Sequence, residues 1–237
     1  MKARHLHSWQ MTPDQAKKVQ RELAVMVSRR NELETVRLVA GVDISAPNAE
    51  GLARAAVVVL SYPELAPVET KVITERVTFP YVPGLLSFRE SPLILAVCEE
   101  LEGTPDLILV DGQGIAHPRR LGLASHLGLL WDKPTIGCAK SRLCGEHKIV
   151  PAEPGSYVEM TDNGEVIGAV LRTRAGAAPL YISIGHKVDL ETAVSWVLRC
   201  CCGQRLPEPT RLAHTAASGH PTAPKPADKH LQMKLEL

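Results

Sequence analysis

Two short apolar segments, each ending in a charged residue, place the strongest constraint on the fold. In DLILVD, four consecutive aliphatic residues end at Asp111, and KPTIGCAK ends at Lys140. A short strand that is apolar at every position is typical of a sheet covered on both faces. In such sheets ligands gather at the carboxyl ends of the parallel strands. The sequence therefore predicts an α/β domain with charged side chains at a ligand-binding edge.

The alternation of apolar and polar residues predicts that this sheet also has an antiparallel part. Three strands are predicted over residues 36–44, 53–62 and 68–79, and their short connections favour an antiparallel meander. Further strands are predicted over residues 165–172 and 178–184. Helices are predicted over residues 12–30, 91–101, 119–131, 189–202 and 206–218. The expected architecture is a mixed central sheet, an antiparallel meander continued by parallel strands, flanked by helices.

Length and composition bound the domain organisation. A chain of 237 residues suggests one domain with short appendages. We expect this domain to span residues 1–218, followed by a flexible, Pro-rich C-terminal tail over residues 219–237. The formal net charge of +1 argues neither for nor against a polyanionic partner, because such binding depends on local clusters of charge.

The cysteines and the apolar segments bear on the compartment. Of the six cysteines, three are consecutive and none has CxxC spacing, so we interpret them as reduced thiols. The N-terminal MKARHLHSWQ lacks the apolar core of a signal peptide, and no stretch approaches the ~20 apolar residues that span a bilayer. We expect a cytoplasmic monomer that does not bind membranes.

Three acidic residues are candidates for a metal site. Asp43 lies near the end of the first predicted strand, Asp111 ends the fourth, and Glu90 precedes the helix that leads into the fourth strand. Carboxylates that converge repel each other unless a cation is present, and hard oxygen ligands suit Mg²⁺ or Mn²⁺. The alternative is structural: the two aspartates are turn residues, and Glu90 forms a capping box with Ser87.

The loop DGQGIAHPRR, residues 111–120, combines glycines with a basic cluster. Its backbone N–H groups could cradle a phosphate at a helix start, or its glycines could permit the close approach of a flat base. His117 could instead cap a helix, and Arg119 and Arg120 could be solvated. A purely structural role is harder to argue for Lys140, because lysine is unusual beside a buried segment.

The segment PYVP places Tyr81 between two prolines. Rigid flanks lower the entropy cost of presenting an aromatic ring, which could wedge between bases and replace the stacking of an extruded one. The alternative is a tight turn whose tyrosine packs on the surface. His186 and His214 are isolated histidines, for which a structural role is also open.

Taken together, these motifs resemble the endonuclease V (deoxyinosine 3′-endonuclease) family. The matching stretches occur in family order from about residue 36 to residue 214: AGVDIS, PYVPGLLSFRE, PDLILVDGQGIAHPRRLGLASHLGLL, PTIGCAKSRLCG, ISIGHKVDLETAVSWVLRC and RLPEPTRLAH. The resemblance implies a ribonuclease H-like fold. It also implies a Mg²⁺-dependent enzyme, with Mn²⁺ able to substitute, that cuts DNA at the second phosphodiester bond 3′ of a deaminated base, chiefly hypoxanthine, and leaves 5′-phosphate and 3′-hydroxyl ends.

The resemblance also implies roles for individual residues. The metal carboxylates would be Asp43, Glu90 and Asp111. Lys140, His117 and His214 would lie at or near the catalytic centre. The strand-separating wedge would be Pro80, Tyr81, Val82 and Pro83. The pocket for the flipped base would be lined by Gly84, Leu86, Gly112, Gly114 and Gly122, with Arg89 and Arg119 contacting the nucleic acid. The chain departs from the family at Gln113 and Val82.

Three other functions remain open at this point. An endoribonuclease acting on inosine-containing RNA would use the same fold and metals. A non-catalytic lesion-binding module predicts the loss of a carboxylate, yet all three are present. A phosphatase or nucleotide-binding enzyme on a similar sheet would not need the PYVP wedge. In the tail, a weak nucleic-acid contact is expected only through Lys225, Lys229 and Lys234.

Overall fold

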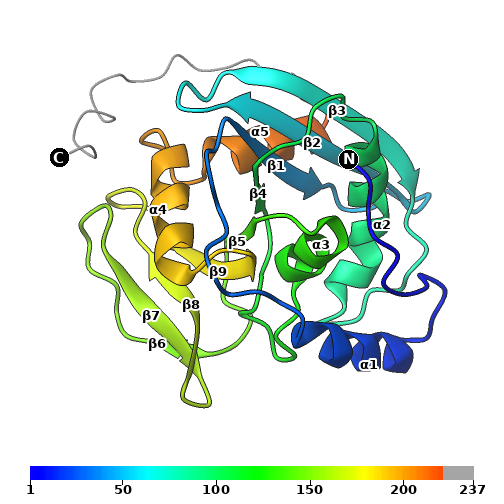
Figure 1. Cartoon of the computed structure of the whole chain (residues 1–237), viewed down its shortest axis with the longest axis horizontal. Coiled ribbons are helices and arrows are strands. Elements are labelled where there is room, and N and C mark those ends of the chain that lie inside the picture. The colour runs from blue at the N-terminus through cyan, green and yellow to red at the C-terminus, as the bar shows by residue number, and fades with distance from the viewer. Residues whose placement is uncertain (221–237) are drawn as a thin grey trace.

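A nine-stranded mixed sheet runs through residues 1–220, the part of the chain that the computed structural model describes (Figure 1). The tail beyond residue 220, with its three lysines, lies outside the described residues. The strands are β1 Leu38–Ile44, β2 Leu52–Ser61, β3 Pro67–Arg76, β4 Leu107–Val110, β5 Thr135–Ala139, β6 Glu146–His147, β7 Tyr157–Asp162, β8 Glu165–Leu171 and β9 Leu180–His186. The helices are α1 Pro13–Ala24, α2 Leu86–Glu99, α3 Leu123–Trp131, α4 Leu190–Cys200 and α5 Glu208–Ala217.

The strand order is β3-β2-β1-β4-β5-β9-β8-β7-β6. β1, β2 and β3 form the antiparallel meander, while β4 is parallel to both β1 and β5. The remaining strands, from β9 to β6, continue the sheet in antiparallel pairs. This arrangement confirms the predicted fold class, α/β with a ribonuclease H-like mixed sheet flanked by helices.

The parallel strands are buried on both faces because their side chains alternate between two cores. On one face, Val39 and Leu109 pack with residues of α4 and α5. On the other, Ala40 and Ile108 pack with residues of α2 and α3 (Figure 1). Each fully buried aliphatic side chain of this kind contributes about 1.5–3 kcal/mol relative to an exposed position. The continuous apolar segments of the sequence thus reflect a three-layer structure.

The second helix begins earlier than predicted. The sequence suggests Ser91 as the N-cap and Pro92 as the first helical residue, but α2 begins at Leu86 and Pro92 lies inside it. Burial of Phe88 in that first part of the helix offsets the hydrogen bond that proline cannot donate. Glu90 therefore lies within α2, and the capping box with Ser87 is excluded.

The ends of two other helices and two short strands also differ from the predictions. α1 ends at Ala24, because Val25 and Met26 face solvent and do not continue its buried stripe. α3 begins at Leu123, after the loop that carries the basic cluster. The strands β6 and β7 are not predicted, because β7 is short and largely polar and β6 has only two residues. No helix in residues 1–220 combines the length and apolarity that crossing a bilayer requires.

Candidate active site

Asp43 and Asp111 meet because their strands are parallel neighbours. Val42 of β1 is paired with Val110 of β4, so the residue that follows each of them lies at the same edge of the sheet. Each aspartate follows the alternation of its strand onto the face covered by α5. Both side chains are largely buried. The predicted convergence of two carboxylates at a strand-end edge is therefore present in the structure.

Helix α5 adds His214 to this pair. The Nδ1 atom of His214 lies 2.7 Å from Oδ2 of Asp43, whose Oδ1 accepts a hydrogen bond from the backbone N–H of Ile44. One ligand atom from each of Asp43, Asp111 and His214 lies within 4.8 Å of the others. Two carboxylates and an imidazole at this spacing form a donor set that suits a divalent cation.

Lys140 and Glu90 complete the charged cluster. The Nζ atom of Lys140, at the end of β5, lies 2.5 Å from Oδ2 of Asp111. Burial, together with the charges of Asp43 and Asp111, raises the pKa of the Glu90 carboxyl to about 8. Burial and the nearby Asp111 also raise the pKa of Asp43. These shifts express the cost of gathering negative charge in a poorly solvated site, a cost that a bound cation would relieve.

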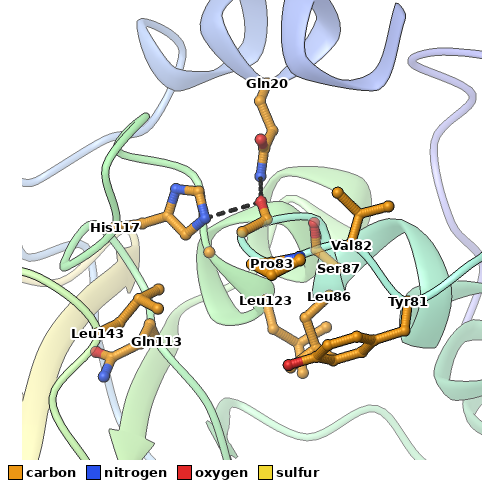
Figure 2. A pocket seen from close by; sticks show the side chains of 12 residues that line it. Gln20, Tyr81, Val82, Pro83, Leu86, Ser87, Gln113, His117, Leu123 and Leu143 are labelled. Carbon is orange, nitrogen blue, oxygen red and sulfur yellow. Dashed lines mark hydrogen bonds between the residues drawn. The ribbon is translucent and has the colours of Figure 1, made fainter. Parts of the chain in front are cut away.

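The structure has a pocket of about 160 Å³ near this cluster in the chain. Its lining includes Gln113, two residues after Asp111. Its walls come from α1, the PYVP segment, the start of α2, the loop before α3 and the loop after β5 (Figure 2). The lining residues are Gln20, Tyr81, Val82, Pro83, Gly84, Leu86, Ser87, Gln113, His117, Gly122, Leu123 and Leu143. Most of these side chains are apolar, and such a lining suits the faces of a planar ligand.

His117 lies in the wall of this pocket rather than among the carboxylates. Its Nδ1 accepts a hydrogen bond from the backbone N–H of Arg119, so Nε2 carries the proton and donates to the Gly84 carbonyl, at 3.0 Å. Burial, and then the nearby charges of Arg119 and Arg120, lower the pKa of His117 to about 4. The ring is therefore neutral near pH 7, where it acts as a hydrogen-bond donor.

The PYVP segment projects from a loop that is anchored at both ends. Tyr81 is 72% exposed, and the flanking prolines also face solvent. At one end, Arg89 donates a hydrogen bond to the Phe79 carbonyl at 2.7 Å. At the other end, Arg119 donates to the Gly84 carbonyl at 2.7 Å. The two arginines therefore hold the loop at both ends.

The predicted glycines divide into two groups. Gly84 and Gly122 line the pocket, whereas Gly112 and Gly114 are not among its lining residues. A Cβ on Gly114 would lie 1.9 Å from the Ile184 carbonyl oxygen, so this glycine allows the loop to pack against β9. Arg120 is held by Asp162 and Glu165, in ion pairs of 2.8 and 2.6 Å.

Several pocket residues were missed by sequence reasoning. They are Gln20, Ser87, Gln113, Leu123 and Leu143. The sequence marks Gln113 only as a departure from the family, and it places Gln20 on a helix without a role. Within residues 1–220, the buried Ser87 Oγ and Gln113 Oε1 have no hydrogen-bond partner. The sequence did hold one signal for Gln20: it is a polar residue on an otherwise apolar stripe of its helix.

Comparison with known proteins identifies one family. Residues 21–215 match the family model described as Endonuclease V. An endonuclease V from Dehalococcoides mccartyi is 56% identical over 218 residues, which cover 92% of this chain and 98% of that protein.

Solved structures give the same result. The crystal structure of endonuclease V from Streptomyces avermitilis superimposes with a TM-score of 0.84 at 39% identity, covering 90% of this chain and 94% of that one. An endonuclease V from Ciona intestinalis, crystallised with a 24mer DNA containing an inosine followed by a ribo-adenosine, gives a TM-score of 0.71 at 31% identity. That match covers 87% of this chain and 96% of the other.

Proposed function

The chain belongs to the endonuclease V family, and on this premise we propose that it is a Mg²⁺-dependent repair endonuclease for deaminated bases, chiefly deoxyinosine. In this proposal it everts the base and hydrolyses the second phosphodiester bond 3′ of the lesion, leaving 5′-phosphate and 3′-hydroxyl ends. We assign the activity to residues 1–218 and expect it in the cytoplasm.

One observation carries this proposal. Two of the proposed carboxylate ligands, Asp43 and Asp111, present ligand atoms within 4.8 Å of each other and of one from His214, and the pocket residue Gln113 lies two residues after Asp111 on the same loop. The complex of the Ciona relative with inosine-containing DNA supports the choice of substrate. A lesion-binding module or a phosphatase would need only part of this arrangement.

The cleavage site would be assembled from the charged cluster. Asp43, Glu90 and Asp111 would hold Mg²⁺, which Mn²⁺ could replace, and the bound ion would activate a water and offset charge on the phosphoryl group. His214 holds the Asp43 carboxylate in orientation through its 2.7 Å contact. Lys140 holds Asp111 and offers a positive charge to the phosphate.

Recognition would be divided between the wedge and the pocket. Tyr81, with Pro80, Val82 and Pro83, would enter the stack and take the place of the extruded base. Gly84 and Gly122 form part of the pocket wall, and Leu86 offers an apolar surface for a planar ring. A deaminated purine pairs more weakly than a normal one, so its extrusion costs less free energy.

A second candidate is an endoribonuclease that cuts inosine-containing RNA. The DNA bound by the Ciona relative carries a ribo-adenosine after the inosine, so a ribose is compatible with binding in that family member. Matched DNA and RNA substrates distinguish a ribose that is tolerated from one that is required.

The test uses end-labelled DNA and RNA duplexes of one sequence, each with a single inosine, incubated with and without Mg²⁺ or Mn²⁺. We expect a nick at the second bond 3′ of inosine in DNA, dependent on the cation and absent in Asp43→Asn and Asp111→Asn. Cutting confined to RNA would select the alternative function. A wild-type protein that is inert on both substrates with either cation would overturn the proposal.

A further inference from the structure

Gln20 occupies a position where an apolar residue would be expected. It follows Ala16 and precedes Leu23 on the buried stripe of α1, at the i, i+4 and i+7 spacing of a core-facing helix. Its side chain is 0% exposed. Burying an amide is unfavourable unless its polar atoms are hydrogen-bonded, so the contacts of this side chain explain its presence.

The amide of Gln20 bridges two loops. Its Nε2 donates to the Gly84 carbonyl at 3.0 Å and to the Leu121 carbonyl at 2.9 Å, while its Oε1 accepts from Nε of Arg119 at 2.5 Å. Figure 2 shows Gln20 reaching from its helix toward the oxygen that His117 also contacts. Gly84 directly follows the wedge segment, and Leu121 precedes the pocket residue Gly122. One side chain therefore sets the separation of two pocket walls.

The Gly84 carbonyl is the centre of this arrangement. It accepts hydrogen bonds from Gln20, from His117 and from Arg119. Gly84 has a φ of +77°, which L side chains rarely adopt, and a Cβ there would lie 2.7 Å from the Arg119 guanidinium. The Gly84 carbonyl, directly after the wedge segment, is thus held by three hydrogen-bond donors. Of these, only Gln20 comes from α1.

We propose that Gln20 is a positioning residue for lesion recognition, holding the wedge and the pocket at the spacing that accepts an everted base. The inference rests on the proposed function. This positioning role depends on the two N–H groups of the Gln20 amide. An apolar residue of similar size would fill the same space but would not join the two loops. The hydrogen bonds of Gln20 go to the two loops and to Arg119, none of which belongs to the charged cluster, so its effect should appear in binding.

Two variants separate the hydrogen bonds from the shape. Gln20→Leu removes all three contacts, and Gln20→Glu retains an acceptor for Arg119 but loses both donors. Affinity for an inosine duplex and for the matched undamaged duplex is measured without a catalytic cation. We expect each variant to lower the ratio of the two affinities by about tenfold or more, the loss of roughly 1.4 kcal/mol. Cleavage at saturating substrate with Mg²⁺ should be little changed, so the loss should appear in KM.

Lys18→Gly is the matched control on the same helix. Lys18 is exposed, and its substitution weakens α1 without touching the pocket. If this variant lowers the melting temperature as much as the Gln20 variants and also lowers the affinity ratio as much, Gln20 is merely structural. An unchanged ratio in Gln20→Glu would equally overturn the inference.

A measurement on the wild-type protein does not depend on the folding of any variant. The side-chain amide signals of Gln20 in ¹⁵N-labelled protein should shift when the inosine duplex is added, and less when the undamaged duplex is added. Identical responses would contradict a role in recognition. If the wild-type protein shows no preference for inosine at all, the proposed function itself fails. A preference that survives both Gln20 substitutions removes only this inference.

Discussion

Tyr81, at the tip of the proposed wedge, combines an exposed side chain with a restrained loop. Its ring is exposed, yet the loop below it is held by hydrogen bonds to the Phe79 and Gly84 carbonyls. Side chains that are exposed contribute little to the free energy of unfolding, whereas rigid presentation lowers the entropy cost of binding. The proposed wedge is therefore exposed at its tip and restrained at its base.

We expect Tyr81→Ala to lower the ratio of affinities for inosine and undamaged duplexes, because the stacking that replaces the everted base is lost. The free energy of unfolding should change by less than about 0.5 kcal/mol. Competition binding and urea unfolding check the two statements. Tyr157→Ala, which removes a 45% exposed tyrosine from β7, is the control and should leave the ratio unchanged. Equal selectivity in the two variants would remove the wedge assignment.

At the scale of elements, the contact between β1 and α5 decides the geometry of the carboxylate cluster. Gly41 lies in β1 where the start of α5 crosses it, and a Cβ there would lie 2.0 Å from the Pro209 carbonyl oxygen. This close approach lets α5 carry His214 to Asp43. A strand glycine that looks dispensable in the sequence is thus required by the helix packed on it.

Gly41→Ala should push α5 away from β1 and lengthen the contact between His214 and Asp43. We expect a loss of about 1–3 kcal/mol in the free energy of unfolding, as for other overpacked cores, together with a marked loss of cleavage. Urea unfolding and nicking assays provide the measurements. Gly103→Ala is the control, since its Cβ would meet only the Leu38 side chain, at 3.8 Å. Wild-type behaviour in Gly41→Ala would show that the helix can shift without consequence.

At the scale of the whole molecule, the N-terminal segment is joined to the helical layer through a pair of histidines. Nε2 of His7 lies 2.7 Å from Nε2 of His126, which is fully buried in α3, and both rings contact Trp9 and Phe88. Burial, and then the neighbouring His7, lower the pKa of His126 to about 3. Burial also lowers the pKa of His7.

This pair makes the fold sensitive to acid. An unfolded histidine takes up a proton near pH 6.5, whereas folded His126 remains neutral until about pH 3, so the unfolded state binds more protons between those values. The stabilisation is present above pH 6.5 and is lost as the pH falls. We expect the contribution of His126 to the free energy of unfolding to fall by roughly 2–4 kcal/mol between pH 7 and pH 4. Urea unfolding across this range should show a shallower dependence in His126→Asn, and an unchanged slope would contradict the assignment.

Much of the fold and part of the site could be predicted from local patterns. The alternating and continuous apolar segments indicated the mixed sheet, and the end of each parallel strand indicated where Asp43 and Asp111 would lie. Pro92 misled the prediction of α2, because the local preference of proline was outweighed by the burial of Phe88. The role of Gln20 was not visible, since its partners are 64 and 101 residues away.

Most of the helices and strands, their buried faces and the acidic residues at the strand ends could be read from the chain, because these follow from side-chain periodicity within one element. The contact of His214 with Asp43, the place of His117 in the pocket wall and the hydrogen bond from α1 to Gly84 became visible only in the packed fold. A hydrogen bond forms only when its donor and acceptor lie about 2.7–3.2 Å apart, so a shift of a few tenths of an ångström between elements can break it. Such distances are set by the packing of the whole core and leave no periodic trace in the chain.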